Sequence, residues 1–334
     1  MPRSDRRTFL ASSGAAILAG MAGCTGGDGT PTIGLNYVVP VENLGSLMEI
    51  DEIQAELDNI GDEYEVEIQS DPGTPDSINA MAAGETDMVL VTTVSYASAI
   101  ANEAVPGGFT AIAMDFWDAH PDRFGFEVYS NLDQTDVENP EDMEGSQLGI
   151  SAVGTGVHAV YVSMLNDVGL GRDDVEFIEL EFPATTEALN DGRFDTGMYP
   201  AFFGPQARSE DFNLVFRSQD TWTDGQYPFA WYVASNNSLE EKGEAFDALG
   251  EDYIQLVDYV FDNRDEVVSL AAEHFELPES LIDAFYLTED FDYYRQDSTV
   301  DVDALNNHMS SLVELDFLEE NRDYSEFVNN EFVS

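Results

Sequence analysis

The sequence predicts a folded α/β protein built from two similar lobes in series. Segments typical of strands alternate with segments of helical apolar spacing between residues 32 and 114, and the alternation starts again after residue 144. Each half also contains a short helix that stops at a glycine and turns into a strand near an aspartate, over 80–87 and 188–195. The 334 residues are enough for two domains with cores of their own.

In the first half, apolar residues set the elements in an order typical of a parallel sheet. Leu47, Ile50 and Ile53 begin a helical repeat, and residues 64–68 alternate apolar with acidic side chains. Thr74 is expected to cap the next helix, with Pro75 at its first position. The expected elements are strands over 32–39, 64–68, 87–91 and 109–114, and helices over 47–60 and 74–84.

The second half repeats this alternation, and the last third of the chain is mostly helical. A helical end after two α/β lobes suggests that the chain crosses back to complete the first lobe. The expected strands are 147–153, 175–180, 194–199 and 229–234, and the expected helices are 157–168, 184–191, 246–260, 267–275, 280–286 and 304–318.

The N-terminus resembles an export signal. Arg6 and Arg7 precede an apolar run of about a dozen residues, which is too short to cross a bilayer. The paired arginines resemble a twin-arginine signal, and Met-Ala-Gly-Cys ending at Cys24 resembles a lipobox. We expect a signal peptide over 1–24, a tether over 25–31 and an extracytoplasmic protein whose Cys24 carries a lipid anchor in the outer face of the cell membrane. The alternative is a buried N-terminal helix with a chance arginine pair.

Acidic residues dominate the composition. The chain has 67 Asp and Glu against 12 Lys and Arg, with Lys242 as its single lysine and a formal net charge of −55. Such charge repels the compact state unless salt screens it, and in molar salt the Debye length falls to about 3 Å. The composition therefore favours a protein that works in high salt, and it resembles that of haloarchaeal proteins. It also argues against nucleic-acid binding, which requires basic surface.

Three segments resemble one family of receptors. Residues 73–89 resemble the loop, helix and strand of the solute receptors of ABC importers for nitrate, sulfonate, taurine and thiamine precursors. Residues 141–150 resemble the segment that opens their second lobe, although Met143 and Gln147 depart from the usual leucine and basic residue. Residues 154–158 resemble their small-residue loop before a helix. The similarity runs in order over about 32–330.

The resemblance implies a type II periplasmic-binding fold, in which two α/β lobes joined by two crossing strands close on a ligand. We expect the crossings near 129–131 and 226–229, with 32–129 plus 228–334 as the first lobe and 130–227 as the second. The expected partners are a small solute, an ABC permease with its ATPase, and the membrane through the lipid anchor. We expect a monomer without nucleic acid, cofactor or metal.

Loops that follow parallel strands supply the candidate site, because such sheets bind ligands beyond the carboxyl ends of their strands. Hydroxyls offer neutral hydrogen bonds, the Gly-Thr-Gly loop opens a helix whose N–H groups favour an electron-rich group, and the tyrosines can wall a cleft. The candidate ligand contacts are Asn36, Tyr37, Thr74, Thr92, Thr93, Ser95, Gly154, Thr155, Gly156, His158 and Tyr199.

Each candidate has an alternative interpretation. Thr92, Thr93 and Ser95 could only cap the next helix, the Gly-Thr-Gly loop could be a tight turn, His158 could lie on a helix surface and Tyr199 could pack in the core. No arginine stands clearly at a strand end, so an organic acid, zwitterion or heterocycle is favoured over an inorganic anion.

The leading hypothesis is an extracytoplasmic receptor that captures a small polar organic solute, such as a sulfonate, a taurine-like compound or a pyrimidine. The alternatives are an enzyme of thiamine- or menaquinone-precursor metabolism on the same fold, and a receptor that feeds a sensor. The sequence contains no nucleophile elbow, phosphate loop or paired metal-binding histidines, and its four histidines are scattered. We therefore expect a binding protein rather than an enzyme.

Overall fold

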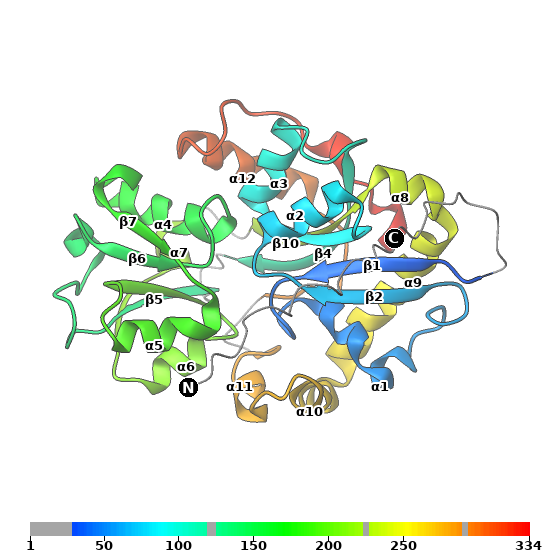
Figure 1. The fold of residues 1–334 in the computed structure, drawn as a ribbon, viewed down its shortest axis with the longest axis horizontal. Helices are drawn as coiled ribbons and strands as arrows, with labels where there is room; N and C mark the ends of the chain where they lie inside the picture. Colours follow the sequence, from blue (N-terminus) through cyan, green and yellow to red (C-terminus); the bar gives the residue numbers. More distant parts are fainter. Residues whose placement is uncertain (1–28, 119–124, 223–226, 289–292) are drawn as a thin grey trace, which may run out of the picture.

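The protein consists of two sheets, each flanked by helices on both faces (Figure 1). The structure is a computed structural model that describes residues 29–118, 125–222, 227–288 and 293–334. The expected signal peptide with Cys24 and most of the tether lie outside these residues. Within them, no helix is both long and apolar enough to cross a membrane.

The first sheet has the order β2-β1-β3-β10-β4. β1 is parallel to β2 and β3, whereas β10 is antiparallel to both of its neighbours. The strand that separates β3 from β4 therefore comes from more than 100 residues later in the chain. The strands are β1 Thr32–Tyr37, β2 Glu65–Ser70, β3 Met88–Thr92, β4 Phe109–Asp118 and β10 Tyr227–Ser235, and the helices between the first four are α1 Asp51–Gln54, α2 Thr74–Ala83 and α3 Thr93–Ala101.

The second sheet has the order β7-β6-β8-β5-β9, which repeats the order of the first. β6 is parallel to β7 and β8, and β5 is antiparallel to β8 and β9. In both sheets, therefore, one antiparallel strand lies between the third and fourth strands of a parallel set. The elements are β5 Phe126–Ser130, β6 Gln147–Ile150, α4 Gly156–Asp167, β7 Glu176–Glu179, α5 Thr185–Asn190, β8 Thr196–Pro200, α6 Gly204–Ser209, β9 Asn213–Arg217 and α7 Ser218–Thr221.

The chain passes between the sheets twice. The first passage lies between the end of β4 at Asp118 and the start of β5 at Phe126, and the second lies between Thr221 and Tyr227. The expected first boundary after Tyr129 is wrong, because β5 pairs only with strands of the second sheet. The alternation of apolar and polar residues does not reveal which sheet a fully buried strand joins.

The helical end of the chain packs on the first sheet, as the crossing back of β10 requires. Figure 1 shows α8 and α9 beside this sheet, α12 above it next to α3, and α10 and α11 below. The helices are α8 Asn236–Glu241, α9 Gly243–Asp262, α10 Arg264–His274, α11 Glu279–Asp283 and α12 Val302–Glu314.

The helix expected over 47–60 is wrong. A short 3-10 helix covers Leu44–Glu49, and Ile50 then has an extended backbone before α1. The apolar side chains that suggested a helix are buried all the same, Leu47 and Ile53 completely. Asp252 on α9 ends the segment, because its fully buried carboxylate accepts the backbone N–H groups of Asn59 and Ile60. A distant hydrogen-bond acceptor thus replaces the helical bonds in this stretch.

Candidate ligand-binding site

A pocket lies between the two sheets, at the carboxyl ends of β1, β3, β6 and β8. This is where open parallel sheets generally bind ligands. Both sheets contribute to its walls, so the pocket exists only when the two lobes meet. The lining residues are Val38, Val39, Glu42, Asn43, Gly73, Thr74, Leu90, Thr92, Phe116 and Phe229 from the first lobe, and Phe126, Ser151, Thr155, Val157, Phe182 and Pro200 from the second.

The pocket has a small inner cavity and a wider mouth. The inner cavity measures about 50 Å³, which is room for a few water-sized groups. A second hollow of about 280 Å³ shares Val38, Val39 and Phe182 with it and is also lined by Asp71 and Glu181. An organic solute therefore has to extend into the mouth, or the lobes have to move apart to admit it.

Three hydroxyl side chains form a hydrogen-bonded chain beside the inner cavity. Thr74 Oγ1 lies 2.9 Å from Ser95 Oγ, which lies 3.0 Å from Thr92 Oγ1. Thr92 Oγ1 also accepts the backbone N–H of Gly156 at 3.1 Å. Thr74 and Thr92 belong to the first lobe and Gly156 opens α4 of the second, so this hydroxyl chain joins the lobes directly.

The N-termini of α2, α3 and α4 meet at this hydroxyl chain, where their N–H groups and dipoles favour an electron-rich group. The residue that precedes α2 is Gly73, so the expectation that Thr74 caps this helix is wrong, and Thr74 Oγ1 bonds to Ser95 instead. Ser95 Oγ also accepts the Thr92 N–H at 3.3 Å. Of the two hydroxyls at the start of α3, that of Thr92 thus also lines the pocket, and that of Ser95 lies behind it.

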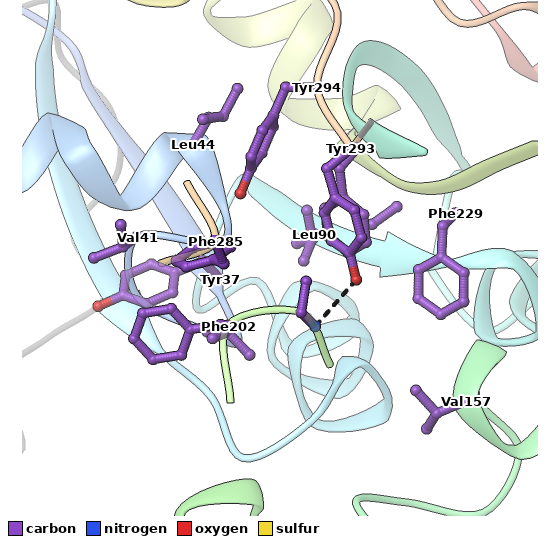
Figure 2. Close-up of a cluster of buried hydrophobic side chains, with 14 of the residues drawn as sticks. Tyr37, Val41, Leu44, Leu90, Val157, Phe202, Phe229, Phe285, Tyr293 and Tyr294 are labelled. Atoms are coloured by element: carbon purple, nitrogen blue, oxygen red, sulfur yellow. Dashed lines mark hydrogen bonds between the residues drawn. The ribbon is translucent and has the colours of Figure 1, made fainter. Parts of the chain in front are cut away.

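Aromatic rings fill most of the remaining space between the lobes. Phe116 and Phe229 stack with ring centroids 5.5 Å apart, and Phe229 meets Phe126 of the second lobe at 4.6 Å. Tyr293 stacks on Phe116, donates a hydrogen bond to the Gly125 carbonyl and accepts one from the Ala201 N–H. Figure 2 shows Phe229 and Tyr293 within a cluster of buried hydrophobic side chains, with a hydrogen bond to Tyr293 dashed. The pocket walls are therefore mainly apolar.

Glu42 is the one ionisable side chain among the described residues that line the inner cavity. It follows β1 and is 3% exposed, and its Oε1 has no hydrogen-bond partner. Burial raises the pKa of its carboxyl to about 8; the charges of Asp115 and Asp118 add to this, and a hydrogen bond from the Phe202 N–H opposes it. Sequence reasoning missed Glu42, because one acid among 67 carries no sign of its burial.

The structure brings only part of the predicted site together. Thr74, Thr92 and Thr155 line the pocket, and Ser95 and Gly156 bond directly to these threonines or lie beside them. Thr93 is completely buried at the start of α3 and lies close to Gly156. Gly154 lies in the adjoining turn, with a φ of 78°.

Asn36, Tyr37, His158 and Tyr199 are not among the lining residues of this pocket either. Asn36 donates to Asp71 at 2.8 Å, and the hydroxyl of Tyr199 bonds to Thr186 within its own lobe. Burial and Glu49 raise the pKa of Tyr37. His158 accepts the Gly154 N–H and packs between Phe177 and Phe317, and burial lowers its pKa to about 4.

The described part of the chain contains no cluster of three or more His, Cys, Asp or Glu side chains arranged to hold a metal.

A family model described as NMT1/THI5 like matches residues 63–266, which is more than half of the chain. The chain belongs to the NMT1/THI5-like family. The match covers the second sheet, the first sheet except β1, and most of the lining residues of the pocket, from Gly73 to Phe229. No curated protein sequence matches this NMT1/THI5-like chain at a significant level.

Solved structures show the same fold at low sequence identity. The alkanesulfonate-binding protein SsuA from Xanthomonas axonopodis pv. citri, bound to MOPS, matches with a TM-score of 0.70 at 12% identity, over 90% of this chain and 98% of that one. The periplasmic aliphatic sulphonate binding protein SsuA from Escherichia coli matches with a TM-score of 0.66 at 14% identity, over 90% and 92%. A mutant of DSZB in complex with biphenyl-2-sulfinic acid matches at 0.62 and 13%, over 91% and 98%. The NMT1/THI5-like chain thus has the periplasmic-binding fold.

Proposed function

We propose that this protein is an extracytoplasmic receptor that captures a small polar organic solute by closure of its two lobes and delivers it to an ABC permease. The observation that carries the proposal is the pocket between the sheets, which takes its walls from both lobes. Two chain passages connect the sheets, so a rotation about them would open the pocket by separating the aromatic contacts between the lobes. A ligand that contacts both lobes stabilises the closed form.

The sheets define the two moving bodies of this proposal. The first body comprises residues 29–118 with 227–334, and the second comprises 125–222. The Thr92–Gly156 hydrogen bond and the Phe229–Phe126 contact form when these bodies meet. Closure is therefore coupled to the residues that surround the ligand.

Export and anchoring belong to the same proposal and rest on the N-terminal sequence. In it, the twin arginines direct export, Cys24 becomes the lipidated first residue of the mature monomer, and the high-salt habitat accounts for the acidic surface. Cys24→Ser is expected to release the protein from the membrane fraction into the medium. Retention of this variant in the membrane would contradict the anchor.

The solute is expected among small polar organic compounds. Two proteins with the same fold are described as binding sulfonates, which supports testing sulfonates, taurine-like compounds, pyrimidines and small carboxylates. The described residues that line the inner cavity include no cysteine, histidine or lysine, and Glu42 is the one ionisable side chain among them. Recovery of the bound solute unchanged is therefore the observation that separates a receptor from an enzyme.

The test is a thermal-shift screen of the mature protein in molar salt, followed by small-angle scattering. A true ligand is expected to raise the melting temperature and reduce the radius of gyration, and to be recovered unchanged. An unchanged scattering profile at saturating ligand would exclude closure. Conversion of the ligand to a product would show that the protein is an enzyme on the same fold and not a receptor.

A further inference from the structure

Glu42 stands on a loop whose backbone is fixed in detail. The preceding residue, Val41, has a φ of 68°, a conformation that β-branched residues rarely adopt. The Val41 N–H donates to Ser46 Oγ at 2.8 Å, and Asn43 Oδ1 accepts two further N–H groups, from Val38 and Val39. These hydrogen bonds therefore hold a strained backbone at Val41, the residue just before Glu42, whose side chain lines the pocket.

Asp115 anchors the same loop from β4. Its carboxylate accepts the Asn43 amide at 3.2 Å and the Leu44 N–H at 2.9 Å. Asp118, at the end of β4, accepts the hydroxyls of Ser218 and Tyr227 at 3.0 Å each. Of these three buried acids, Glu42 is the one with an oxygen that has no hydrogen-bond partner. A buried polar oxygen without a hydrogen-bond partner lowers the stability of the folded protein, which points to a hydrogen-bond donor from outside the protein.

The groups that face Glu42 make an anion an unsuitable partner. Asp115 and Asp118 act on its carboxyl electrostatically, and Tyr293 and Tyr294 are the nearby tyrosines affected by its charge. No Lys, Arg or His is among the described residues that line the inner cavity or its mouth, where Asp71 and Glu181 are the ionisable groups. Surface acids are common throughout this chain, so the argument rests on the buried Glu42.

We propose that Glu42 is the specificity-determining residue of this pocket and that it selects solutes carrying a protonated nitrogen. The inference rests on the proposed receptor function. The ammonium or amidinium of the solute donates to Glu42 Oε1, and its carbon skeleton packs against the rings of Phe116, Phe126 and Phe229. Aromatic faces also attract cations, so these walls favour the same class.

The hydroxyl side of the pocket is compatible with a second, electron-rich group on the same solute. The N-termini of α2, α3 and α4 lie there, and the hydroxyls of Thr74 and Thr92 can exchange their mutual bonds for bonds to a ligand. A zwitterion therefore satisfies both sides. A solute with an anionic group alone offers no donor to an ionised Glu42 and lies beside the acids Asp115 and Asp118.

The experiment compares matched solutes by isothermal titration calorimetry in molar salt. The pairs are 2-phenylethylammonium against 3-phenylpropanoate, and 2-aminoethanesulfonate against ethanesulfonate. The nitrogen-bearing member of at least one pair is expected to bind, at least about tenfold more tightly than its anionic partner, because a hydrogen bond to a charged group is worth about ten- to a hundredfold. Glu42→Gln is expected to remove most of this difference, and Glu42→Asp to restore part of it.

Glu144→Gln serves as the matched control, because it makes the same chemical change at an exposed acid that lines neither the inner cavity nor its mouth. It is expected to leave the affinity within about twofold. Since burial and the neighbouring acids raise the pKa of Glu42, the affinity of wild-type protein for 2-phenylethylammonium should also rise from pH 6 to pH 8. This profile tests Glu42 without a mutation.

Two results would overturn the inference. One is equal or tighter binding of the anionic partners, and the other is unchanged discrimination in the Glu42→Gln protein. If the anions bind and scattering still reports closure, the receptor function stands while the role of Glu42 fails. If no nitrogen-bearing probe binds, the role of Glu42 fails as well, and the broader solute screen then decides whether the receptor function falls with it.

Discussion

The two sides of the pocket differ in how their polar groups are satisfied. On the hydroxyl side, Thr74, Ser95 and Thr92 bond to one another, and Thr92 accepts an N–H from the opposite lobe. On the acid side, Glu42 has an oxygen with no partner. The hydroxyl side can therefore close on itself, whereas the acid side remains unsatisfied until a donor arrives.

This difference separates two tasks that a receptor must perform. Groups that satisfy one another set the geometry of the closed form and contribute to its stability in the absence of solute. A buried group without a partner lowers the stability of that form and gains the most from the right ligand. Closure should thus depend on the hydroxyl side, and discrimination on the acid side.

The largest expected effect concerns stability against pH. Burial raises the pKa values of Glu42 and Asp115 to about 8 in the folded protein, from ordinary values of 4.5 and 3.8. Between the ordinary pKa values and pH 8, the two carboxyls stay protonated in the folded protein but are ionised in the unfolded chain. The free energy of unfolding therefore falls as pH rises through this range. Each such group contributes a slope of up to about 1.4 kcal/mol per pH unit.

Glu42→Gln removes one of the two groups, so its stability should decline less steeply than that of the wild type between pH 5 and pH 8. Urea denaturation at constant molar salt measures both slopes. Glu144→Gln, which alters an exposed acid, should follow the wild-type slope. Parallel curves for the wild type and Glu42→Gln would mean that Glu42 is already ionised in the folded protein over this range, which would contradict its raised pKa.

A smaller effect is expected where the lobes meet. A methyl group at Gly156 would lie 2.7 Å from the Phe229 ring, which is 1% exposed and packed against Phe116 and Phe126. Gly156→Ala should therefore oppose closure at a cost of about 1–3 kcal/mol, the usual range for an overpacked site. Titration calorimetry should report a loss of affinity of roughly five- to a hundredfold for the solute found in the screen.

Gly243→Ala is the control for this variant, because a methyl group there meets nothing within 4 Å. It should bind solute as the wild type does. Wild-type affinity in Gly156→Ala would show that the ligand-bound lobes stand farther apart than they do in this structure.

The smallest effect is expected from the hydroxyl chain. Thr92→Val keeps the shape of the side chain but removes the acceptor of the Gly156 N–H. The expected cost is about 1 kcal/mol, or roughly fivefold in affinity, and scattering of the solute-free protein should shift toward the open form. Thr86→Val changes a hydroxyl that bonds within the first lobe and should leave both quantities unchanged. A change in selectivity in Thr92→Val would assign discrimination to the hydroxyl side instead.

The alternation of elements was predictable because period-two and helical spacings depend on local sequence. The strands before and after α2 and the long helix α9 follow from such spacings, whereas the return of the chain to the first sheet was inferred from its helical last third. The region from Leu47 to Ile60 was not predictable in the same way, because Asp252, almost 200 residues away, provides its hydrogen-bond acceptor.

The candidate site was predictable only where it depends on strand ends. Thr74, Thr92 and Thr155 follow from that rule. Tyr37 and Tyr199 lie within the ends of β1 and β8, but the direction of a side chain at a strand end depends on the register of the sheet, which the sequence does not state. Glu42 requires knowledge of three distant segments, β4, Phe202 and Tyr293, that together exclude water from its carboxyl group.

The exchange of one strand between the sheets also constrains how the chain acquires its structure. β3 and β4 lack a common neighbour until Tyr227–Ser235 has been synthesised, so two-thirds of the polypeptide must leave the ribosome before the first sheet can form. Such distant pairing slows folding and leaves strand edges exposed to aggregation in the meantime. The first sheet is therefore expected to be completed only after the whole second lobe has been synthesised.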